Sequence, residues 1–195
     1  MKRILLSAAV TLGSAATSTQ AQTWNLDKSH SKVKFSVSHM LISEVEGKFK
    51  MYDGKITSTK DDFSDATIEF NIDVNSIDTD DENRDKHLKG DDFFNAEKFP
   101  NITFKGKSMK KVSGKNYKLT GELTMRDVTK TVEFDVVYNG TTKDPWGNTR
   151  AGFKVTGKLN RMQYGLKWNA ALETGGLVVG EEVSLTADIE IIKQK

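Results

Sequence analysis

The chain alternates apolar and polar residues over most of its length after residue 30. Val33, Phe35 and Val37, for example, are each followed by a polar residue. A period of two places every second side chain on the same face of a β-strand. The pattern recurs often enough to predict eight strands, several of them about ten residues long. The alternating segments are 33–37, 45–51, 68–74, 102–104, 117–125, 132–138, 151–159 and 183–191.

The segments between the predicted strands are short and rich in Gly, Asn and Asp, which favour tight turns. We place such turns at Asp53-Gly54, at residues 113–116 and at Asn139-Gly140. Short turns join antiparallel neighbours. Eight long strands form either a sandwich or a barrel, and closure into a barrel removes exposed edges and leaves room for one ligand. The sequence therefore predicts an all-β protein, an eight-stranded antiparallel β-barrel.

One segment interrupts the strand pattern. Thr79 and Glu82 form a capping-box pattern, which predicts a short helix through residues 83–88 that ends at Gly90. A second turn follows it, so we predict a short helical insertion at residues 79–95. The insertion and the residues after it carry four apolar side chains, and we expect these to cover the mouth of the barrel. They are Leu88, Phe93, Phe94 and Phe99.

The first 21 residues have the composition of a secretory signal peptide. Lys2-Arg3 gives a positive start, residues 4–16 are apolar or small, and Ala21 ends a small-x-small cleavage pattern. Polar residues replace the apolar ones before the stretch reaches the ~20 residues that a membrane anchor needs. We expect residues 1–21 to be cleaved and residues 22–195 to form a single periplasmic domain.

Charge and cysteine content exclude several classes of function. Of the 29 Lys and Arg residues, two (Lys2 and Arg3) lie in the predicted signal peptide, which leaves 27 basic against 27 acidic residues. A neutral domain gives no electrostatic basis for binding nucleic acid or an anionic membrane surface. The chain has no Cys, so neither disulfides nor thiolate metal sites can form. A sizeable core must therefore hold the exported domain together.

Candidate catalytic residues are few. The spacing of His30, His39 and His87 matches no metal-ligand pattern. A histidine bonded to a neighbouring carboxylate is the better interpretation, with Asp85 available to His87. Paired carboxylates such as Asp80-Asp81 lie in polar turns, where solvated charge is the ordinary state. We therefore expect no catalytic residue, no metal ligand and no cofactor, and interpret the chain as a binding protein and not as an enzyme.

The predicted apolar face mixes large and small side chains. Gly47, Gly121, Ala151 and Gly157 share it with many Phe and Met residues, and such a mixture gives either a tightly packed core or an open channel. Its aromatic residues are scattered, whereas a membrane barrel shows two aromatic girdles, so we expect the face to point inward. The candidate ligand-binding residues are Phe35, Val37, His39, Phe49, Met51, Phe70, Phe104, Leu123, Met125, Phe134, Phe153 and Leu159, with Leu88, Phe93 and Phe94 from the insertion.

Several short motifs follow one another along nearly the whole predicted mature domain. They include Trp24-x-Leu26-Asp27, Phe35-x-Val37-x-His39, Ser76-Ile77-x-Thr79, Arg84-Asp85-x-His87-Leu88, Asp92-Phe93-Phe94, Gly121-x-Leu123-Thr124-Met125, Asn160-Arg161 and Val179-Gly180-Glu181-Glu182-Val183. Each motif is weak alone, but the ordered set resembles the YceI-like family of polyisoprenoid-binding proteins. Asp127 departs from the pattern, because it stands in a hairpin turn where Gly is expected.

The resemblance implies a lipocalin-like barrel, exported to the periplasm, that holds an isoprenoid chain in its lumen. It implies binding, storage or transport of lipids such as prenyl quinones or polyprenyl carriers, and an association with stress responses. A polar headgroup would lie near the mouth, where the residues able to meet it are His39, Arg84, Asp85, His87 and Arg161. The alternatives are a carrier of fatty acids or fatty amides, and a packed barrel that acts through surface contacts with a membrane redox partner. Transient membrane contact and a homodimer also stay open.

Overall fold

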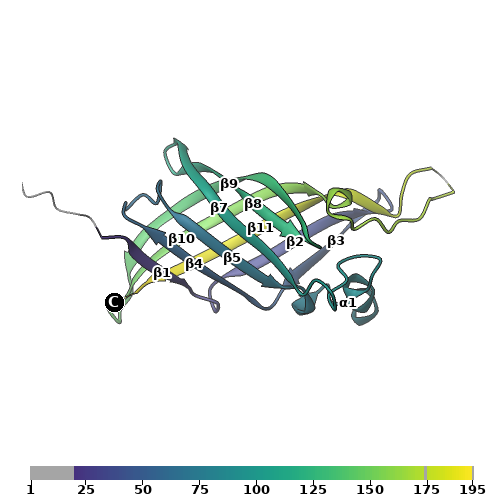
Figure 1. Cartoon of the computed structure of the whole chain (residues 1–195), viewed down its shortest axis with the longest axis horizontal. Coiled ribbons are helices and arrows are strands. Elements are labelled where there is room, and N and C mark those ends of the chain that lie inside the picture. The colour runs from purple at the N-terminus through teal and green to yellow at the C-terminus, as the bar shows by residue number, and fades with distance from the viewer. Residues whose placement is uncertain (1–19, 174, 195) are drawn as a thin grey trace, which may run out of the picture.

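The computed structural model describes residues 20–173 and 175–194. The predicted signal peptide therefore lies, except for its last two residues, outside the described part of the chain. One antiparallel sheet closes on itself to form an eight-stranded barrel with one short helix at one end (Figure 1). The predicted fold class is confirmed. Among the described residues, no helix combines the length and the hydropathy that crossing a bilayer requires.

The sheet consists of eleven strand segments within the described residues. They are β1 (Gln22–Leu26), β2 (Lys32–His39), β3 (Ser43–Phe49), β4 (Tyr52–Ser58), β5 (Thr67–Asp73), β6 (Ile77–Asp78), β7 (Asn101–Ser113), β8 (Asn116–Met125), β9 (Val128–Lys143), β10 (Thr149–Asn160) and β11 (Val179–Lys193).

Three of the eight barrel strands are each divided into two segments. β1 and β2 both pair with β11, at its end and at its beginning respectively. β4 pairs with β1, and β3 pairs with β2. β5 pairs with β4 and β6 with β3, and the short 3-10 helix η1 (Val74–Ser76) separates them. The ring closes through the pairing of β1 with β11.

The alternation of side chains determines which face is buried. Along β8, Tyr117, Leu119, Gly121 and Leu123 are buried, whereas the residues between them are not. This face points into the barrel, as its period of two predicts. Charged residues such as Lys118, which pairs with Glu133 and Asp135 on β9, lie on the outer face.

One of the three predicted turns is confirmed and two are wrong. Residues 113–116 join β7 to β8, with Gly114 in the left-handed region. Asp53-Gly54 lies inside β4. Asn139-Gly140 lies inside β9, where it forms a bulge: Gly140 faces Gly152 and Tyr138 faces Phe153, so Asn139 has no direct partner. The β9–β10 turn comes later, at residues 144–148.

The helical insertion forms as predicted, with a different N-cap. Helix α1 (Glu82–Lys89) ends at Gly90, but the Asp81 carboxylate caps it by accepting a hydrogen bond from the Arg84 amide at 2.9 Å. Thr79 lies outside the helix, where its hydroxyl donates to Asp85 at 2.6 Å and accepts from Arg84 Nε at 2.8 Å. The insertion lies against one end of the barrel (Figure 1).

The opposite end of the barrel is closed by aromatic packing and an ion network. Phe63, in the β4–β5 loop, is buried, and its ring lies 5.1 Å from the ring centroids of both Trp24 and Phe153. Nearby, the Arg150 guanidinium bonds three carboxylates, those of Asp27, Asp144 and Glu190. One end of the lumen is therefore sealed, and the candidate entrance lies at the end that carries α1.

Candidate ligand-binding cavity

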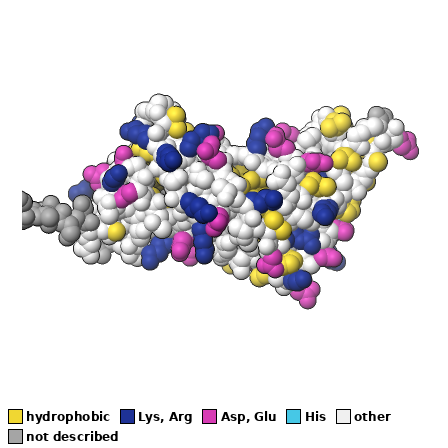
Figure 2. All heavy atoms as spheres, turned by 45° about the horizontal axis from the view of Figure 1, so that its top comes forward, with side chains coloured by type: hydrophobic (Ala, Val, Ile, Leu, Met, Phe, Trp, Pro, Cys, Tyr) yellow, Lys and Arg dark blue, Asp and Glu magenta, His cyan; other side chains and the backbone are white. Residues whose placement is uncertain are grey.

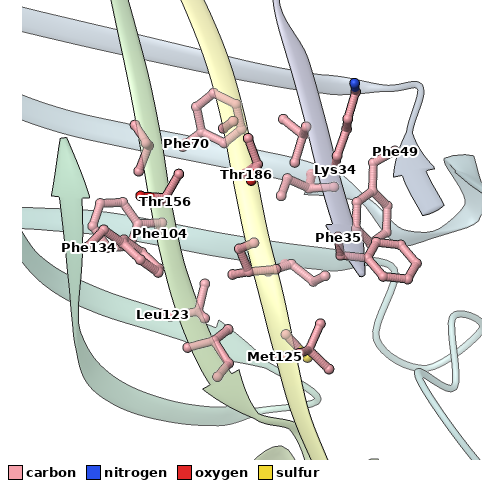
Figure 3. A pocket seen from close by; sticks show the side chains of 18 of the residues that line it. Lys34, Phe35, Phe49, Phe70, Phe104, Leu123, Met125, Phe134, Thr156 and Thr186 are labelled. Carbon is pink, nitrogen blue, oxygen red and sulfur yellow. The ribbon is translucent and has the colours of Figure 1, made fainter. Parts of the chain in front are cut away.

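The barrel encloses a cavity of about 260 Å³. Its wall is almost entirely apolar, with side chains from every barrel strand (Figure 3). The insertion contributes Leu88, Phe93 and Phe94. The polar residues along it are few, namely Lys34, Thr156, Thr186, Arg161 and Tyr164. Folded cores rarely contain voids larger than a water molecule. A space of this size, bordered almost entirely by apolar side chains, is thus suited to a hydrocarbon.

Glycines in the wall make room for the aromatic rings. A Cβ at Gly47 would lie 2.3 Å from the Phe35 ring, which shows that the ring occupies the space above the bare backbone. The same arrangement recurs at three other glycines. A Cβ would lie 2.3 Å from the Phe104 ring at Gly121, 2.3 Å from the Phe134 ring at Gly157 and 2.6 Å from the Phe70 ring at Gly54. The rings therefore lie against the wall, and the mixture of Phe and Gly on this face produces an open lumen and not a packed core.

Aromatic side chains cover the lumen at the end that carries α1. Phe93 and Phe94 are buried, and Leu88 packs against the core beside them. The rings of His87, Phe93 and Trp168 contact one another, with centroids 5.0 to 5.5 Å apart. His87 Nε2 lies 3.0 Å from an Asp92 carboxylate oxygen, so its partner is Asp92 and not the expected Asp85. Three of the four predicted covering residues, Leu88, Phe93 and Phe94, lie at the mouth beside Trp168, which follows η2 (Arg161–Tyr164). The fourth, Phe99, does not line the cavity, and its ring centroid lies 5.9 Å from the Arg126 guanidinium carbon instead.

Arg161 is a buried cation beside this apolar space. Its side chain is held by four backbone carbonyls, those of Gly180, Leu166, Trp168 and Val179, at 2.6 to 3.1 Å. The residue is 5% exposed. Burial lowers the pKa of its guanidinium, and the charge of Glu181 opposes that change. Arg161 thus joins η2, the 166–168 segment and the start of β11, and gives this end of the cavity positive charge.

Tyr164 is the second buried polar residue at this end. It is 2% exposed, and its hydroxyl has no hydrogen-bond partner among the described residues. Burial raises the pKa of this hydroxyl. Tyr164 belongs to the family motif Tyr164-Gly165-Leu166, as Arg161 belongs to Asn160-Arg161, but it is absent from the predicted ligand-binding residues because η2 carries no strand pattern.

Of the sixteen predicted ligand-binding residues, namely the fifteen of the apolar face and the insertion together with Arg161, all but two line the cavity. The fourteen are Phe35, Val37, Phe49, Phe70, Leu88, Phe93, Phe94, Phe104, Leu123, Met125, Phe134, Phe153, Leu159 and Arg161. Met51 was placed wrongly: it is 61% exposed, because the strand is interrupted after Phe49 and the inward phase resumes at Tyr52. His39 ends β2, half-buried and outside the wall of the cavity. Contact of the fourteen with a ligand stays a prediction.

Sequence reasoning missed a part of the wall. Leu185, Ala187, Ile189 and Ile191 belong to a strand that was predicted, and its alternation could have identified them. Phe63 comes from an irregular loop, where no periodic signal exists.

A group of possible metal ligands lies at the sealed end. Ligand atoms of Asp27, His30 and Glu190 lie within 4.8 Å of one another. Arg150 Nη1 already bonds Asp27 at 2.5 Å and Glu190 at 2.7 Å, so a side-chain cation occupies the position between the carboxylates. We interpret the group as a structural ion network.

Comparison with known proteins identifies relatives over nearly the whole chain. The model of the YceI-like domain matches residues 24–191. A UPF0312 protein of Staphylococcus aureus (strain USA300) is 38% identical over 168 residues, which is 86% of this chain and 95% of the relative.

Solved structures of the same shape include three from other bacteria. BcnA of Burkholderia cenocepacia superposes with a TM-score of 0.72 at 22% identity, over 85% of this chain and 98% of its own. A YceI protein of Campylobacter jejuni gives 0.69 at 27% identity, over 97% and 100%. A polyisoprenoid binding domain from Saccharophagus degradans gives 0.65 at 15% identity, over 88% and 98%.

Proposed function

The chain belongs to the YceI-like family, and we propose that it binds one long apolar lipid in the lumen of its barrel. The observation that carries this proposal is the cavity of about 260 Å³ with its apolar wall. Side chains that border an empty space lose the dispersion contacts that a packed core would provide. A hydrocarbon in the lumen restores these contacts and needs no hydrogen bonds from the wall.

The cargo that we propose is a polyisoprenoid, such as a prenyl quinone or a polyprenyl carrier. The Saccharophagus degradans neighbour is described as a polyisoprenoid binding domain, and a methyl-branched chain suits a wall that alternates Phe rings with Val, Leu and Ile. Each buried methylene contributes about 0.8 kcal/mol. A long prenyl chain therefore offsets the roughly 4–15 kcal/mol of freedom lost on association.

A fatty acid or fatty amide is the second candidate cargo. Arg161 is buried at one end of the cavity, and no carboxylate lies within ion-pair distance of it in the described part of the chain. A carboxylate or amide headgroup would provide an acceptor for this positive charge. The alternative of a packed barrel that acts only through its surface is disfavoured by the open lumen.

We propose that the protein acts in the periplasm, where it stores or transports its lipid without chemical change. The signal-peptide pattern of residues 1–21 and the absence of Cys support an exported protein that depends on its core. A soluble barrel with an enclosed lumen would shield a prenyl chain from water between two membranes.

Replacement of Phe104 tests the lumen as the binding site. Phe104 is buried, lies in the wall and contacts the Phe134 ring at a centroid distance of 5.6 Å. A Phe104→Asp variant places a charge in the lumen, and we expect at least tenfold weaker binding of a fluorescent prenyl lipid in a titration. Thr103→Asp puts the same charge on the outer face and serves as the control. Equal affinity of folded Phe104→Asp and wild-type protein, with folding checked by circular dichroism, would show that the lumen is not the site.

A further inference from the structure

Two segments project together from the end of the barrel that carries α1. One is the turn between β2 and β3, residues 40–42, and the other is the loop formed by residues 169–173 and 175–178, which extends farthest to the right in Figure 1. The Met40 amide donates to the Val178 carbonyl at 2.8 Å. The Leu41 side chain lies against Gly176, where a Cβ would come within 2.8 Å of Leu41 Cδ1. The two segments therefore form one projection.

This projection exposes four large apolar side chains, which we call the apolar tip. Ile42 is 85% exposed, Leu41 70%, and Met40 and Leu177 39% each. Residues 39–43 and 175–180 contain no Lys, Arg, Asp or Glu. Hydrophobic side chains gather at this end of the molecule in Figure 2. Clustered exposed apolar residues mark an interaction site more often than single ones do.

The backbone of the turn is unsuited to the residues that it carries. Met40 and Leu41 have φ values of 53° and 63°, and two consecutive positive φ values in a hairpin are the signature of a turn that favours Asn-Gly. Bulky side chains are disfavoured in this conformation. The β8–β9 turn has similar φ values but carries the polar pair Arg126-Asp127. Neither the turn geometry nor solvation explains why Met40 and Leu41 stand at these two positions. Their presence indicates that the side chains act by contact with an apolar partner.

The apolar tip is continuous with the wall of the lumen. Val37 lines the cavity three residues before Met40, and Val179 lines it two residues after Leu177. His39 and Val179 are paired across β2 and β11. Apolar residues thus lead without interruption from Val179 through Val178 to Leu177, whereas Ser38 and His39 lie between Val37 and Met40 on the other segment. A hydrocarbon chain would follow the first of these segments from the cavity to the tip.

We propose that the apolar tip inserts into a lipid membrane surface and sets the mouth of the lumen against the bilayer. The proposal rests on the proposed function, because it gives the carrier its place of loading and unloading. A convex tip of four side chains is far smaller than the ~20–30 residues a side of a standard protein–protein interface. A fluid headgroup layer fits it without a complementary surface, and binding then scales with the apolar area inserted.

The charges beside the tip indicate which membranes it binds. Glu44, Glu173 and Glu181 lie in the neighbouring residues on the two segments, and carboxylates repel an anionic surface. We therefore expect docking to zwitterionic phosphatidylcholine vesicles, with little dependence on salt. Stronger binding to phosphatidylglycerol vesicles that is lost in salt would overturn the apolar mode of docking.

A single fluorescent label tests insertion directly. The chain contains no Cys, so Ile42→Cys can be labelled at one position with an environment-sensitive dye. Val112→Cys is the matched control, because Val112 is 62% exposed and lies near the β7–β8 turn, away from α1 (Figure 1). We expect phosphatidylcholine vesicles to increase the emission of the label at residue 42 alone. An unchanged signal at residue 42, or an equal increase at both positions, would contradict the proposal.

A second experiment separates the tip from the cavity. We expect the double variant Leu41→Ser/Ile42→Ser to take up a fluorescent prenyl lipid from vesicles at least tenfold more slowly than wild-type protein. Its affinity for the same lipid added from ethanol without vesicles should be unchanged, and Val112→Ser should behave as wild type in both assays. Equal uptake rates for wild type and the double variant would refute the proposal that the apolar tip inserts into the membrane. Failure of wild-type protein to bind the lipid without vesicles would instead refute the proposed function.

Discussion

The ring of Phe35 lies over Gly47 on the neighbouring strand, in the space that a Cβ of residue 47 would occupy. The two residues face each other in the pairing of β2 with β3. Phe70 and Gly54 are directly paired in the same way on β5 and β4. Because these rings rest on bare backbone, they cover the wall without filling the axis of the barrel. The lumen is therefore built into the strand register.

Substitution of Gly47 by alanine should narrow the lumen. The new Cβ would lie 2.3 Å from Phe35 Cζ and 2.9 Å from the Thr79 methyl carbon, so the ring must move inward. We expect at least fivefold weaker binding of a prenyl lipid, measured by fluorescence titration. The control is Gly152→Ala, whose new Cβ would meet Asn139 at an ordinary 3.6 Å. Loss of affinity in both variants would assign the effect to general destabilisation.

Filling the lumen with a larger side chain should increase the stability of the lipid-free protein and weaken lipid binding. Ala187 lines the cavity on β11, and Ala187→Phe would occupy part of the space that we assign to the lipid. We expect the lipid-free protein to gain about 0.5–2 kcal/mol in free energy of unfolding and to lose most of its lipid affinity. Lys154→Phe, on the outer face of β10, should change neither quantity by much. A lower stability of folded Ala187→Phe would mean that the space is already packed.

Arg161 should be essential for the stability of the mouth. Arg161→Met removes the N–H groups that donate to four backbone carbonyls and leaves these carbonyls without a partner in an apolar region. We expect a loss of about 3 kcal/mol or more in the free energy of unfolding, measured by urea denaturation. Lys167→Met removes an exposed charge six residues later and should stay within about 0.5 kcal/mol of wild type. A similarly small effect at Arg161 would contradict its role as the residue that joins these segments.

The ion network at the sealed end should make the protein sensitive to acid. Burial alone would raise the pKa of Asp27, but hydrogen bonds from Ser29, His30 and Arg150 outweigh it and lower that pKa well below its ordinary value. The pKa of Asp144 is lowered in the same way, by Arg150 and Asn148 against burial. The unfolded chain therefore binds protons more readily than the folded one.

The stability from these two carboxylates is fully present above their unfolded pKa of about 3.9 and is lost as the pH falls through the folded values. We expect the free energy of unfolding to decline steadily below about pH 4. Asp144→Asn should weaken this decline, which urea denaturation at pH 7, 4 and 3 can measure. The same slope in wild type and variant would show that the network does not set the acid response.

Much of the barrel can be predicted from local pattern. Where apolar residues alternate over a long strand, as between Tyr117 and Met125, the strand and its buried face follow directly from the period. β4 was missed because its inward face carries Gly54 and Ser58 beside Tyr52 and Ile56, which removes the apolar signal. Met51 was placed inside because local alternation does not reveal the interruption between β3 and β4.

The open lumen could not be predicted, because it depends on contacts between distant residues. Gly121 lies under Phe104 only because β7 and β8 pair in one register. Phe63 seals one end from an irregular loop, and the Tyr164 hydroxyl is buried within a short 3-10 helix. Such positions are set by tertiary packing, and no periodic pattern marks them.

Native mass spectrometry of the purified mature protein, followed by organic extraction and identification of any released lipid, tests the central claim most directly. We predict one added mass per chain that matches a prenyl lipid, and the loss of this mass in the Ala187→Phe variant. An added mass that matches a fatty acid or amide would support the lipid-carrier function and identify a different cargo. A protein that is purified empty and fails to take up added prenyl lipid or fatty acid would contradict the claim that the lumen is a lipid-binding site.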